Sequence, residues 1–538
     1  MIKMEVVIIE LYLFIIALVC ILSVISIQFM NKIGIPSLLI FIGIGLLFGS
    51  DGILKISFDD YHMTQDIANI ALTFIMFYGG FCTNWKAAKP VAVSSIMLST
   101  IGVILTAGLT GLFCFYVLNT SLLEGLLIGS VLASTDAASV FSILRTKKLN
   151  LKDGLASLLE IESGSNDPIA YLLTTVILGI MSHDSQFSIP VILFQQVVFG
   201  IVCGAFVGLA SSYILKRYRF HKNGMHFILL FAIALSSYAI PTLIGGNGFL
   251  SVYIAGIILG NNPIQDKIEL IHFFDGVTSI MQILLFFSLG LLAFPSQLPS
   301  ILLPATLITL FLTFIARPIA VYLVLLPFHV PLKHQLLVSW AGLRGAASIV
   351  FAILTVVSSA YTNYDIFHIA FFVCIVSVSL QGSLLPYVSK KLDLLENEDN
   401  LSKTFNDYQD TTKFQLVEFH IDKNHKWCHH YIHEIEVPQD MLIVMIKRNH
   451  QIIIPRGDTF ILENDDLILS CQSYDDSSHI ELDEIILYKH HSWIHKKIKD
   501  IKLHHQLIVM IQRQDQCIIP NGQTVLEQGD ILVVYENG

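Results

Sequence analysis

Charged residues are scarce in this chain. Asp, Glu, Lys and Arg make up 14% of its 538 residues, whereas hydrophobic residues make up 54%. This composition excludes an ordinary soluble protein, in which about a quarter of the residues are charged. The apolar residues lie in long uninterrupted runs, so the sequence predicts an all-α, polytopic membrane protein. The first run, from Val6 to about Met30, is longer than a signal-peptide core, and we expect it to remain as a spanning helix.

Several motifs are also missing. The eight cysteines are scattered and include no CxxC pair, which excludes a disulfide framework. The C-terminal tail has no strand followed by GxGxxG, so NAD binding is not predicted. A potassium channel gated by the C-terminal tail would need a filter segment similar to TVGYG. No such segment occurs, which argues against this class of protein. The spans contain no metal-ligand triad or nucleophile–base pair, so neither an enzyme nor a cofactor is predicted.

The apolar runs predict about thirteen transmembrane spans separated by short polar breaks. The eighth span contains Pro241 and is followed by a Gly-Gly-Asn-Gly break, so the eighth and ninth spans could instead form a single re-entrant unit. The spans are expected at about 5–30, 33–54, 66–84, 90–117, 122–144, 155–182, 189–215, 226–243, 248–263, 271–294, 300–326, 334–357 and 364–389.

Basic residues fall almost entirely in one set of alternating loops. The other set holds only Lys55, and Lys3 lies near the N-terminus. Because Lys and Arg are enriched in cytoplasmic loops, we predict that the first set is cytoplasmic, with the N-terminus outside and the C-terminal tail inside. The first set comprises Lys32, Lys86, Lys89, Arg145, Lys147, Lys148, Lys152, Lys216, Arg217, Arg219, Lys222, Lys267, Lys333, Lys390 and Lys391.

The composition changes abruptly after Leu392, where the predicted membrane domain, residues 1–392, ends. An acidic linker, residues 393–411, leads to a polar tail that is predicted to fold in the cytoplasm as two α+β modules, residues 412–480 and 481–538. From Leu401 onward the tail has 13 Lys/Arg against 21 Asp/Glu, a net charge of −8. With this acidic balance, no nucleic-acid partner is expected.

The two tail modules repeat one sequence pattern. Residues 442–448 (LIVMIKR) recur as 507–513 (LIVMIQR), and the Ile-Pro turn at 454–459 recurs at 519–524. With a one-residue slip, 462–466 matches 526–530, which places Asp465 opposite Gly529. Each module is therefore predicted to be β-rich, with a Pro/Gly turn and an acidic turn before its last strand.

Histidine is concentrated in the tail, which holds 12 of the 20 histidines. Their full protonation would shift the net charge of the tail from −8 to +4, so pH sensing is one hypothesis. Surface histidines without a role are the simpler interpretation. His429, His430 and His433 lie beside Cys428, but their spacing matches no strong zinc signature, so no metal site is predicted.

The sixth span contains a polar segment, residues 162–168 (ESGSNDP). A charge at the bilayer centre costs about 2.5–3.5 kcal/mol on insertion scales, so an acid there indicates a functional site. On a helix, Glu162 and Asn166 share one face, and Ser163 and Asp167 share the adjacent face. These oxygens are expected to bind a desolvated monovalent cation, with Asp167 as the charged ligand.

Asp167 is expected to hold a proton or a cation, but not both. A low-dielectric environment favours the protonated carboxyl, whereas a bound cation favours the carboxylate. This competition predicts exchange of the two ions. Because Asn166 rather than a second acid lies beside Asp167, we expect one-for-one, electroneutral exchange.

Two other spans combine helix-weakening residues with one charge each. The fifth contains Ala-Ser-Thr-Asp at 133–136, and the twelfth contains Ala-Gly-Leu-Arg-Gly at 341–345. This pattern predicts two broken helices that cross in an inverted-repeat transporter, with Asp136 offsetting half-helix N-termini and Arg344 offsetting C-termini. The alternative is tight glycine packing with charges that reach the membrane surface.

Together these motifs resemble the NhaP-type branch of the monovalent cation:proton antiporter-1 family. The resemblance covers about residues 5–390 and includes 247–256 in the ninth span and Ala316-Arg317 in the eleventh. It implies a homodimer of thirteen-helix protomers in the bacterial cytoplasmic membrane. It also implies that Asp167 carries the proton and the cation, and that Arg317 pairs with Glu162. The residues expected around the ion are Asn166, Ser163, Glu162 and Thr135, the last through its carbonyl oxygen.

Each tail module resembles the C-terminal half of an RCK (TrkA-C type) regulatory domain, with Asp465 as a departure where the pattern has glycine. The resemblance implies gating by a small ligand and dimerisation through the tail. One implied ligand is a nucleotide second messenger such as cyclic di-AMP, bound between two modules. In the alternative, the two modules pair with each other and only brace the dimer.

The cation has two candidates. ESGSNDP joined to RCK-type tails resembles the potassium/proton members, so K+ is the first choice and Na+ (or Li+) the close alternative. One departure concerns the third span, where Tyr78 precedes Gly79-Gly80 and relatives commonly have an acid. Glu160 has two interpretations: it lines a funnel that leads to the site, or it pairs with a basic neighbour.

Overall fold

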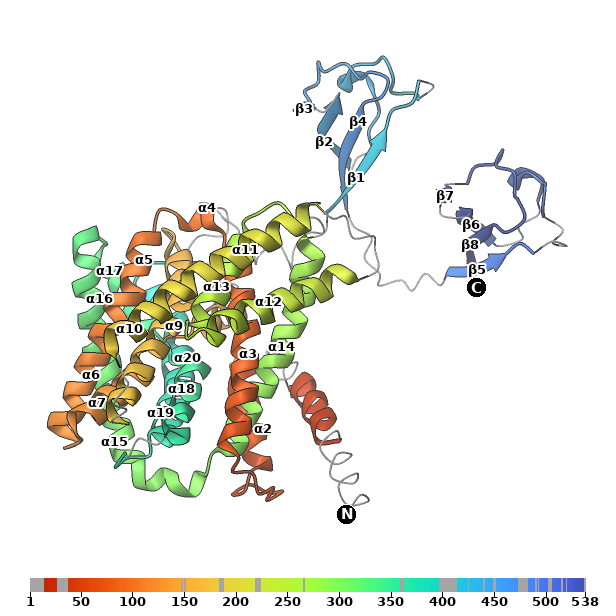
Figure 1. Ribbon diagram of the computed structural model, residues 1–538. Coiled ribbons are helices and arrows are strands. Elements are labelled where there is room, and N and C mark those ends of the chain that lie inside the picture. Colours follow the sequence, from red (N-terminus) through yellow and green to blue (C-terminus); the bar gives the residue numbers. More distant parts are fainter. Residues whose placement is uncertain are drawn as a thin grey trace, which may run out of the picture. The chain divides into compact units, whose positions relative to one another are not determined.

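The structure, a computed structural model, comprises two units, Met1–Asp407 and Tyr408–Gly538 (Figure 1). In the described residues, the first unit is built from helices and the second from strands and short 3-10 helices. The structure describes residues 14–26, 37–146, 149, 151–182, 188–217, 224–264, 267–358, 362–395, 414–423, 425–438, 441–448, 451–472, 482–488, 491, 493–501, 506–513, 516–518 and 520–536.

Long apolar helices dominate the first unit. Within the described residues, six are long and apolar enough to cross a membrane: Ala92–Val117, Ile189–Arg217, Met225–Leu243, Glu269–Leu292, Pro295–Phe328 and Ile366–Lys391. Shorter apolar helices are Phe14–Ser26, Leu38–Phe48, Leu122–Val131, Gly248–Gly260 and Ala346–Val357. The membrane protein predicted from composition therefore has helices of the required length and apolarity.

Four of the long helices are continuous but contain one π-helical turn each. Such turns often mark functional positions. The π-helical turn at Leu312–Ala316 directly precedes Arg317, and another such turn begins at Ser377. The segments are α5 (Ala92–Met97), η1 (Leu98–Gly102) and α6 (Val103–Val117); α10 (Ile189–Phe194), η2 (Gln195–Phe199) and α11 (Gly200–Arg217); α15 (Leu298–Phe311), η4 (Leu312–Ala316) and α16 (Arg317–Leu325); and α19 (Ile366–Val376), η6 (Ser377–Gln381) and α20 (Gly382–Lys391).

The remaining helices include two that the sequence left open as a re-entrant unit. They are separate helices, α12 (Met225–Leu243) and α13 (Gly248–Gly260). Asn247 caps α13, because its side chain accepts a hydrogen bond from the amide of Leu250 at 3.0 Å. The others are α2 (Ser37–Phe48), α3 (Tyr61–Cys82), α4 (Trp85–Ala88), α14 (Lys267–Leu292), η3 (Pro295–Gln297) and η5 (Leu326–Phe328).

Two helices are broken where the sequence predicted. The first break separates α7 (Leu122–Val131) from α8 (Ala137–Thr146), and the second separates α17 (Leu332–Trp340) from α18 (Ala346–Val357). The long helix α9 (Leu155–Met181) follows the first pair, and α19–η6–α20 follows the second. A helix with a π-turn, a broken helix and a second long segment thus occur twice, in the same order.

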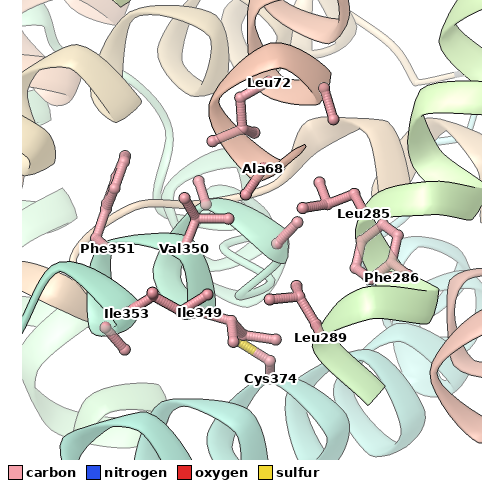
Figure 2. Close-up of a cluster of buried hydrophobic side chains, with 14 of the residues drawn as sticks. Ala68, Leu72, Leu285, Phe286, Leu289, Ile349, Val350, Phe351, Ile353 and Cys374 are labelled. Atoms are coloured by element: carbon pink, nitrogen blue, oxygen red, sulfur yellow. The ribbon is translucent and has the colours of Figure 1, made fainter. Parts of the chain in front are cut away.

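A hydrophobic cluster supports the second broken helix (Figure 2). The half-helix α18 contributes Ile349, Val350, Phe351 and Ile353, which are fully buried or nearly so. They pack against α3, α14 and α19, through side chains that include Ala68, Leu72, Leu285, Leu289 and Cys374. The half-helix is therefore fixed by apolar packing, and its N-terminal end is held at the break.

Within its described residues, the tail contains two four-stranded antiparallel sheets with the same strand order. The first has the order β1-β4-β2-β3, and the second β5-β8-β6-β7. A bulge interrupts the same strand in each, after Ile443 and after Ile508. The strands are β1 (Phe414–His420), β2 (Met441–Arg448), β3 (Gln451–Ile453), β4 (Asp466–Gln472), β5 (Leu482–Ile486), β6 (Gln506–Arg513), β7 (Gln516–Ile518) and β8 (Ile531–Glu536); the short 3-10 helices are Ile432–Glu434 and Ile498–Asp500.

The one-residue slip between the modules is wrong. Arg448 holds Asp465 through two hydrogen bonds of 2.7 Å, and Arg513 holds Asp530 in the same way at 2.8 and 2.9 Å. Asp465 is therefore the counterpart of Asp530, and the offset stays constant. The residue opposite Gly529 is Asn464, and both have left-handed backbone, with φ of 64° and 90°. Asn tolerates this conformation better than most residues, so it replaces the glycine of the pattern.

Candidate functional site

The two helix breaks cross each other. The amide of Asp136 donates to the carbonyl of Leu343 at 2.8 Å. In return, Nη1 of Arg344 donates to the carbonyls of Ala133 and Ser134 at 2.7 and 2.8 Å. Each break therefore satisfies backbone groups that the other leaves without a helical partner.

The two charges at the crossing lie at opposite helix ends. Asp136 precedes α8, and its carboxylate accepts hydrogen bonds from the amide and hydroxyl of Ser139 at 3.3 and 2.6 Å. Arg344 binds carbonyls just beyond the C-terminal end of α7. This is the arrangement expected for charges that offset half-helix dipoles. Gly345 permits the close approach, because a Cβ there would lie 2.4 Å from the Asp136 carboxylate.

One face of α9 is bound to the first break. The hydroxyl of Ser163 donates to the carbonyl of Thr135 at 2.8 Å. The amide nitrogen of Asn166 donates to the hydroxyl of Thr135, and the hydroxyl of Ser134 donates to the carboxylate of Asp167. The structure thus brings together Thr135, Ser163, Asn166 and Asp167, as the sequence predicted.

Two groups in this cluster could bind a ligand. Asn166 is fully buried, and its Oδ1 has no hydrogen-bond partner within the described residues. Asp167 is half-buried, and within the same residues no cationic side chain lies within ion-pair distance of its carboxylate. Native structures rarely leave a buried oxygen such as Asn166 Oδ1 unsatisfied, and Asp167 has no counter-charge, so the arrangement is a candidate site for a cation or a proton.

Glu162 is arranged differently from Asp167. It forms a buried ion pair with Arg317, and their side chains are only 1% and 2% exposed. Arg317 begins α16, and Gly342 in the second break leaves room for it, since a Cβ there would lie 2.7 Å from its Nε. The pair is neutral as a whole, so Asp167 is left as the uncompensated carboxylate of this segment.

Three contributors were not among the predicted site residues. Ser134 hydrogen-bonds Asp167, Ser377 accepts from the amide of Arg344 at 3.0 Å, and Asn247 donates to the carbonyl of Pro168 at 3.0 Å. Because Pro168 has no N–H, the carbonyl of Gly164 lacks the helical hydrogen bond that it would otherwise accept. Ser134 could have been found, because it precedes Thr135 in the motif. Ser377 carried no local sequence signal.

The tail shows no metal centre within its described residues, where no group of three or more His, Cys, Asp or Glu side chains could hold an ion. Two of the three candidate histidines make hydrogen bonds instead: Nδ1 of His433 lies 2.6 Å from the Gly457 carbonyl oxygen, and Nδ1 of His430 lies 3.1 Å from that of Cys428. In the second tail module, the Arg513–Asp530 ion pair changes the pKa of the acid. Although burial opposes it, hydrogen bonding to Arg513 holds the pKa of Asp530 below its ordinary value.

Comparisons with known proteins identify the family and the fold. Residues 14–391 match the transmembrane sodium/hydrogen exchanger family, and residues 416–475 and 483–536 each match the TrkA-C domain. The NhaP-type and TrkA-C resemblances are thus confirmed. The solved structure of the sodium proton antiporter MjNhaP1 from Methanocaldococcus jannaschii at pH 8 shares the fold, with a TM-score of 0.63 and 24% identity over 71% of this chain and 99% of that chain.

Curated relatives span most of the chain. The K(+)/H(+) antiporter NhaP of Alkalimonas amylolytica is 33% identical over 87% of this chain and 82% of its own length. The K(+)/H(+) antiporter NhaP2 of Shewanella sp. (strain ANA-3) is 34% identical over 84% and 79%. The Na(+)/H(+) antiporter ApNhaP of Aphanothece halophytica is 29% identical over 68% and 71%. The chain belongs to the sodium/hydrogen exchanger family and carries two TrkA-C domains in its tail.

Proposed function

We propose that this protein exchanges a monovalent cation for a proton across the bacterial cytoplasmic membrane, with Asp167 as the exchanging group. The observation that carries the proposal is the half-buried Asp167 carboxylate, bound by Ser134 and set beside the unpartnered Oδ1 of Asn166. The ligand set would be completed by Ser163 and the carbonyl of Thr135, with Glu162 held by Arg317 in a structural pair.

The charges around the site support electroneutral exchange. Glu162 and Arg317 neutralise each other, and Asp136 and Arg344 contribute opposite charges at the crossing. Asp167 therefore supplies one negative charge, which one monovalent cation or one proton neutralises. The loaded site is neutral in both states, so the membrane potential has little effect on the exchange.

K+ is the proposed cation, because the two relatives that are 33% and 34% identical are K(+)/H(+) antiporters by name. Na+ (or Li+) is the alternative, favoured by the more distant Na(+)/H(+) antiporter ApNhaP. Both cations bind hydroxyl, carbonyl and carboxylate oxygens, so the donor set fits either.

The remaining features of the proposal follow the sequence pattern. We propose thirteen crossings with two inverted repeats, the N-terminus outside and the tail inside. The membrane domain would be residues 1–392, the linker 393–411, and the tail modules 412–480 and 481–538. The protein would act as a homodimer, regulated by a ligand of the TrkA-C domains such as cyclic di-AMP.

The central experiment measures exchange in proteoliposomes. We expect K+ added outside acid-loaded vesicles to drive proton efflux, with smaller rates for Na+, Li+ or Rb+, and no dependence on an imposed potential. Asp167→Asn should abolish exchange with every cation, whereas Asp59→Asn, in an exposed loop, should leave it unchanged. Retained exchange in correctly inserted Asp167→Asn would refute the site, and a faster rate with Na+ would replace K+ as the cation.

A further inference from the structure

A second carboxylate lies on the same face of α9 as Asp167. Glu160 is seven residues before Asp167, so two helical turns, about 10 Å, separate them along the axis. Glu160 is half-buried, and its carboxylate accepts a hydrogen bond of 3.2 Å from the hydroxyl of Thr83 at the end of α3. Within the described residues Glu160 has no ion-pair partner, so the interpretation that it pairs with a basic neighbour is not supported. An intramembrane acid without a salt bridge indicates a functional position.

A buried tyrosine lies between the two carboxylates. The ring of Tyr253 in α13 packs on the backbone of Gly164, which shares the helix face of Glu160 and Asp167. A Cβ on Gly164 would lie 2.4 Å from Cε2 of this ring and 2.6 Å from its hydroxyl oxygen. The hydroxyl is thus placed over the turn that joins the two acids.

The Tyr253 hydroxyl is unsatisfied. Tyr253 is 4% exposed, and its hydroxyl makes no hydrogen bond to any described residue. Its polar neighbours are the Glu160 carboxylate and the Thr83 hydroxyl, and Thr83 is close enough for a weak interaction but not for a hydrogen bond of ordinary geometry. A buried hydroxyl beside a carboxylate that has no salt bridge is a site that a water or an ion would complete.

The three groups are held on a rigid frame. Gly80 of α3 packs directly on α13, because a Cβ there would lie 2.5 Å from the carbonyl oxygen of Tyr253. At the ends of these helices, Asn261 donates to the carbonyl of Thr83 at 2.9 Å and accepts from the amide of Trp85 at 2.9 Å. The distances among Thr83, Tyr253 and the Glu160 face are therefore set by close helix packing.

We propose that Glu160, Thr83 and Tyr253 form a second cation site, in which a partly dehydrated monovalent cation is held before it reaches Asp167. The site supplies one carboxylate and two hydroxyl oxygens, which are hard donors suited to Na+ or K+. It lies two turns nearer the N-terminal end of α9, on the side that the proposed topology places toward the cytoplasm. The inference rests on the proposed function, since it assumes that Asp167 exchanges the cation.

Kinetics separate this role from a structural one. Glu160→Gln removes a charged ligand of the cation, so it should raise the apparent KM for K+ about tenfold or more. Tyr253→Phe removes a neutral hydroxyl ligand and should raise this KM about two- to tenfold. The maximal rate should stay within about twofold of wild type, and Glu160→Asp should recover part of the affinity. Matched controls are Glu269→Gln and Tyr213→Phe, whose side chains are exposed elsewhere. An unchanged KM in Glu160→Gln, or a lost maximal rate at an unchanged KM, would overturn the proposal.

A binding measurement tests the site without relying on transport. In the full-length Asp167→Asn protein, the exchanging group is absent and Glu160 is intact. We expect a hydrophobic carbodiimide to modify Glu160, as measured by mass spectrometry, and K+ to protect it whereas choline does not. If K+ protects Glu160 in wild type but not in Asp167→Asn, the cation binds only at Asp167 and the second site is refuted. Failure of the proposed function is distinct, because wild type would then show no K+-driven proton efflux.

Discussion

Breaking the Glu162–Arg317 pair should destabilise the protein more than removing it entirely. Both side chains are buried, and the pair is the main charge interaction that either makes in the described residues. Glu162→Gln leaves the Arg317 guanidinium buried without its counter-charge, and removal of one partner of such a pair typically costs about 3–5 kcal/mol. That cost corresponds to a change of about 10²- to 10⁴-fold in the ratio of folded to unfolded protein.

The double variant Glu162→Gln/Arg317→Gln leaves no buried charge. Gln matches Glu in volume but is shorter than Arg, so the double variant should recover much of the stability lost in the single variant, less the cost of the space that Arg317→Gln leaves. Thermal unfolding of the full-length protein in detergent, followed by tryptophan fluorescence, would rank the three proteins. We expect wild type and the double variant to unfold at higher temperatures than Glu162→Gln.

The ranking also tests the roles assigned to the two acids. If Glu162 is structural, a double variant that inserts normally should retain measurable K+-driven proton efflux. A double variant that is stable but fully inactive would show that Glu162 binds the transported ion directly. A single variant as stable as the double variant would refute the reasoning about the buried charge.

Three further outcomes are expected. Gly345→Ala should abolish exchange, because its Cβ would meet the Asp136 carboxylate at the crossing, and the proteoliposome assay measures this. Gly529→Ala should destabilise the tail by about 1 kcal/mol in thermal unfolding, since φ is 90°, whereas Asn464→Gly should not destabilise it. Hydrogen bonding to the Asp466 carboxylate raises the pKa of His420 above 6.5. The stabilising contribution of this pair is therefore fully present below pH 6.5 and is lost as the pH rises through the raised pKa. His420→Gln should flatten the dependence of the unfolding temperature of the tail on pH in that range.

The helical membrane fold could be predicted because its cause is local in the sequence. Runs of apolar residues are required wherever the backbone crosses lipid, and they are visible without knowledge of packing. The helix breaks were predicted for a similar reason: Thr135-Asp136 and Gly342 with Arg344 combine weak helix formers with an intramembrane charge. Such a charge needs partners, and an opposite helix break supplies them.

Which side chains meet in the site depends on how each helix is rotated about its axis relative to its neighbours, and the sequence does not specify this rotation. Periodicity placed Ser163 and Asp167 on one face, but it could not show that Ser134 binds Asp167 or that Ser377 binds the amide of Arg344. Nor could it show the hydroxyl of Tyr253 over Gly164, because these residues are far apart along the chain. Their contacts result from the packing of separate helices.

The error in the tail has a different cause. Asp465 and Asp466 are consecutive acids, so matching by residue type allowed either to be paired with Asp530. The choice is decided by backbone conformation and by the arginine that binds the acid, and both point to Asp465. Matching the Gly529 position by its left-handed requirement would have allowed Asn464 and avoided the slip.

The charge balance at the crossing also explains why exchange would be obligatory. Glu162 and Arg317 are neutral as a pair, so the charge of the site depends on the occupancy of Asp167. With a proton or a cation bound, the site carries no net charge. Without either, an uncompensated carboxylate would have to move through a low-dielectric environment, which is costly. On the proposed mechanism, the empty site would therefore be hindered from changing its exposure, and the protein would move protons one way only as it moves cations the other.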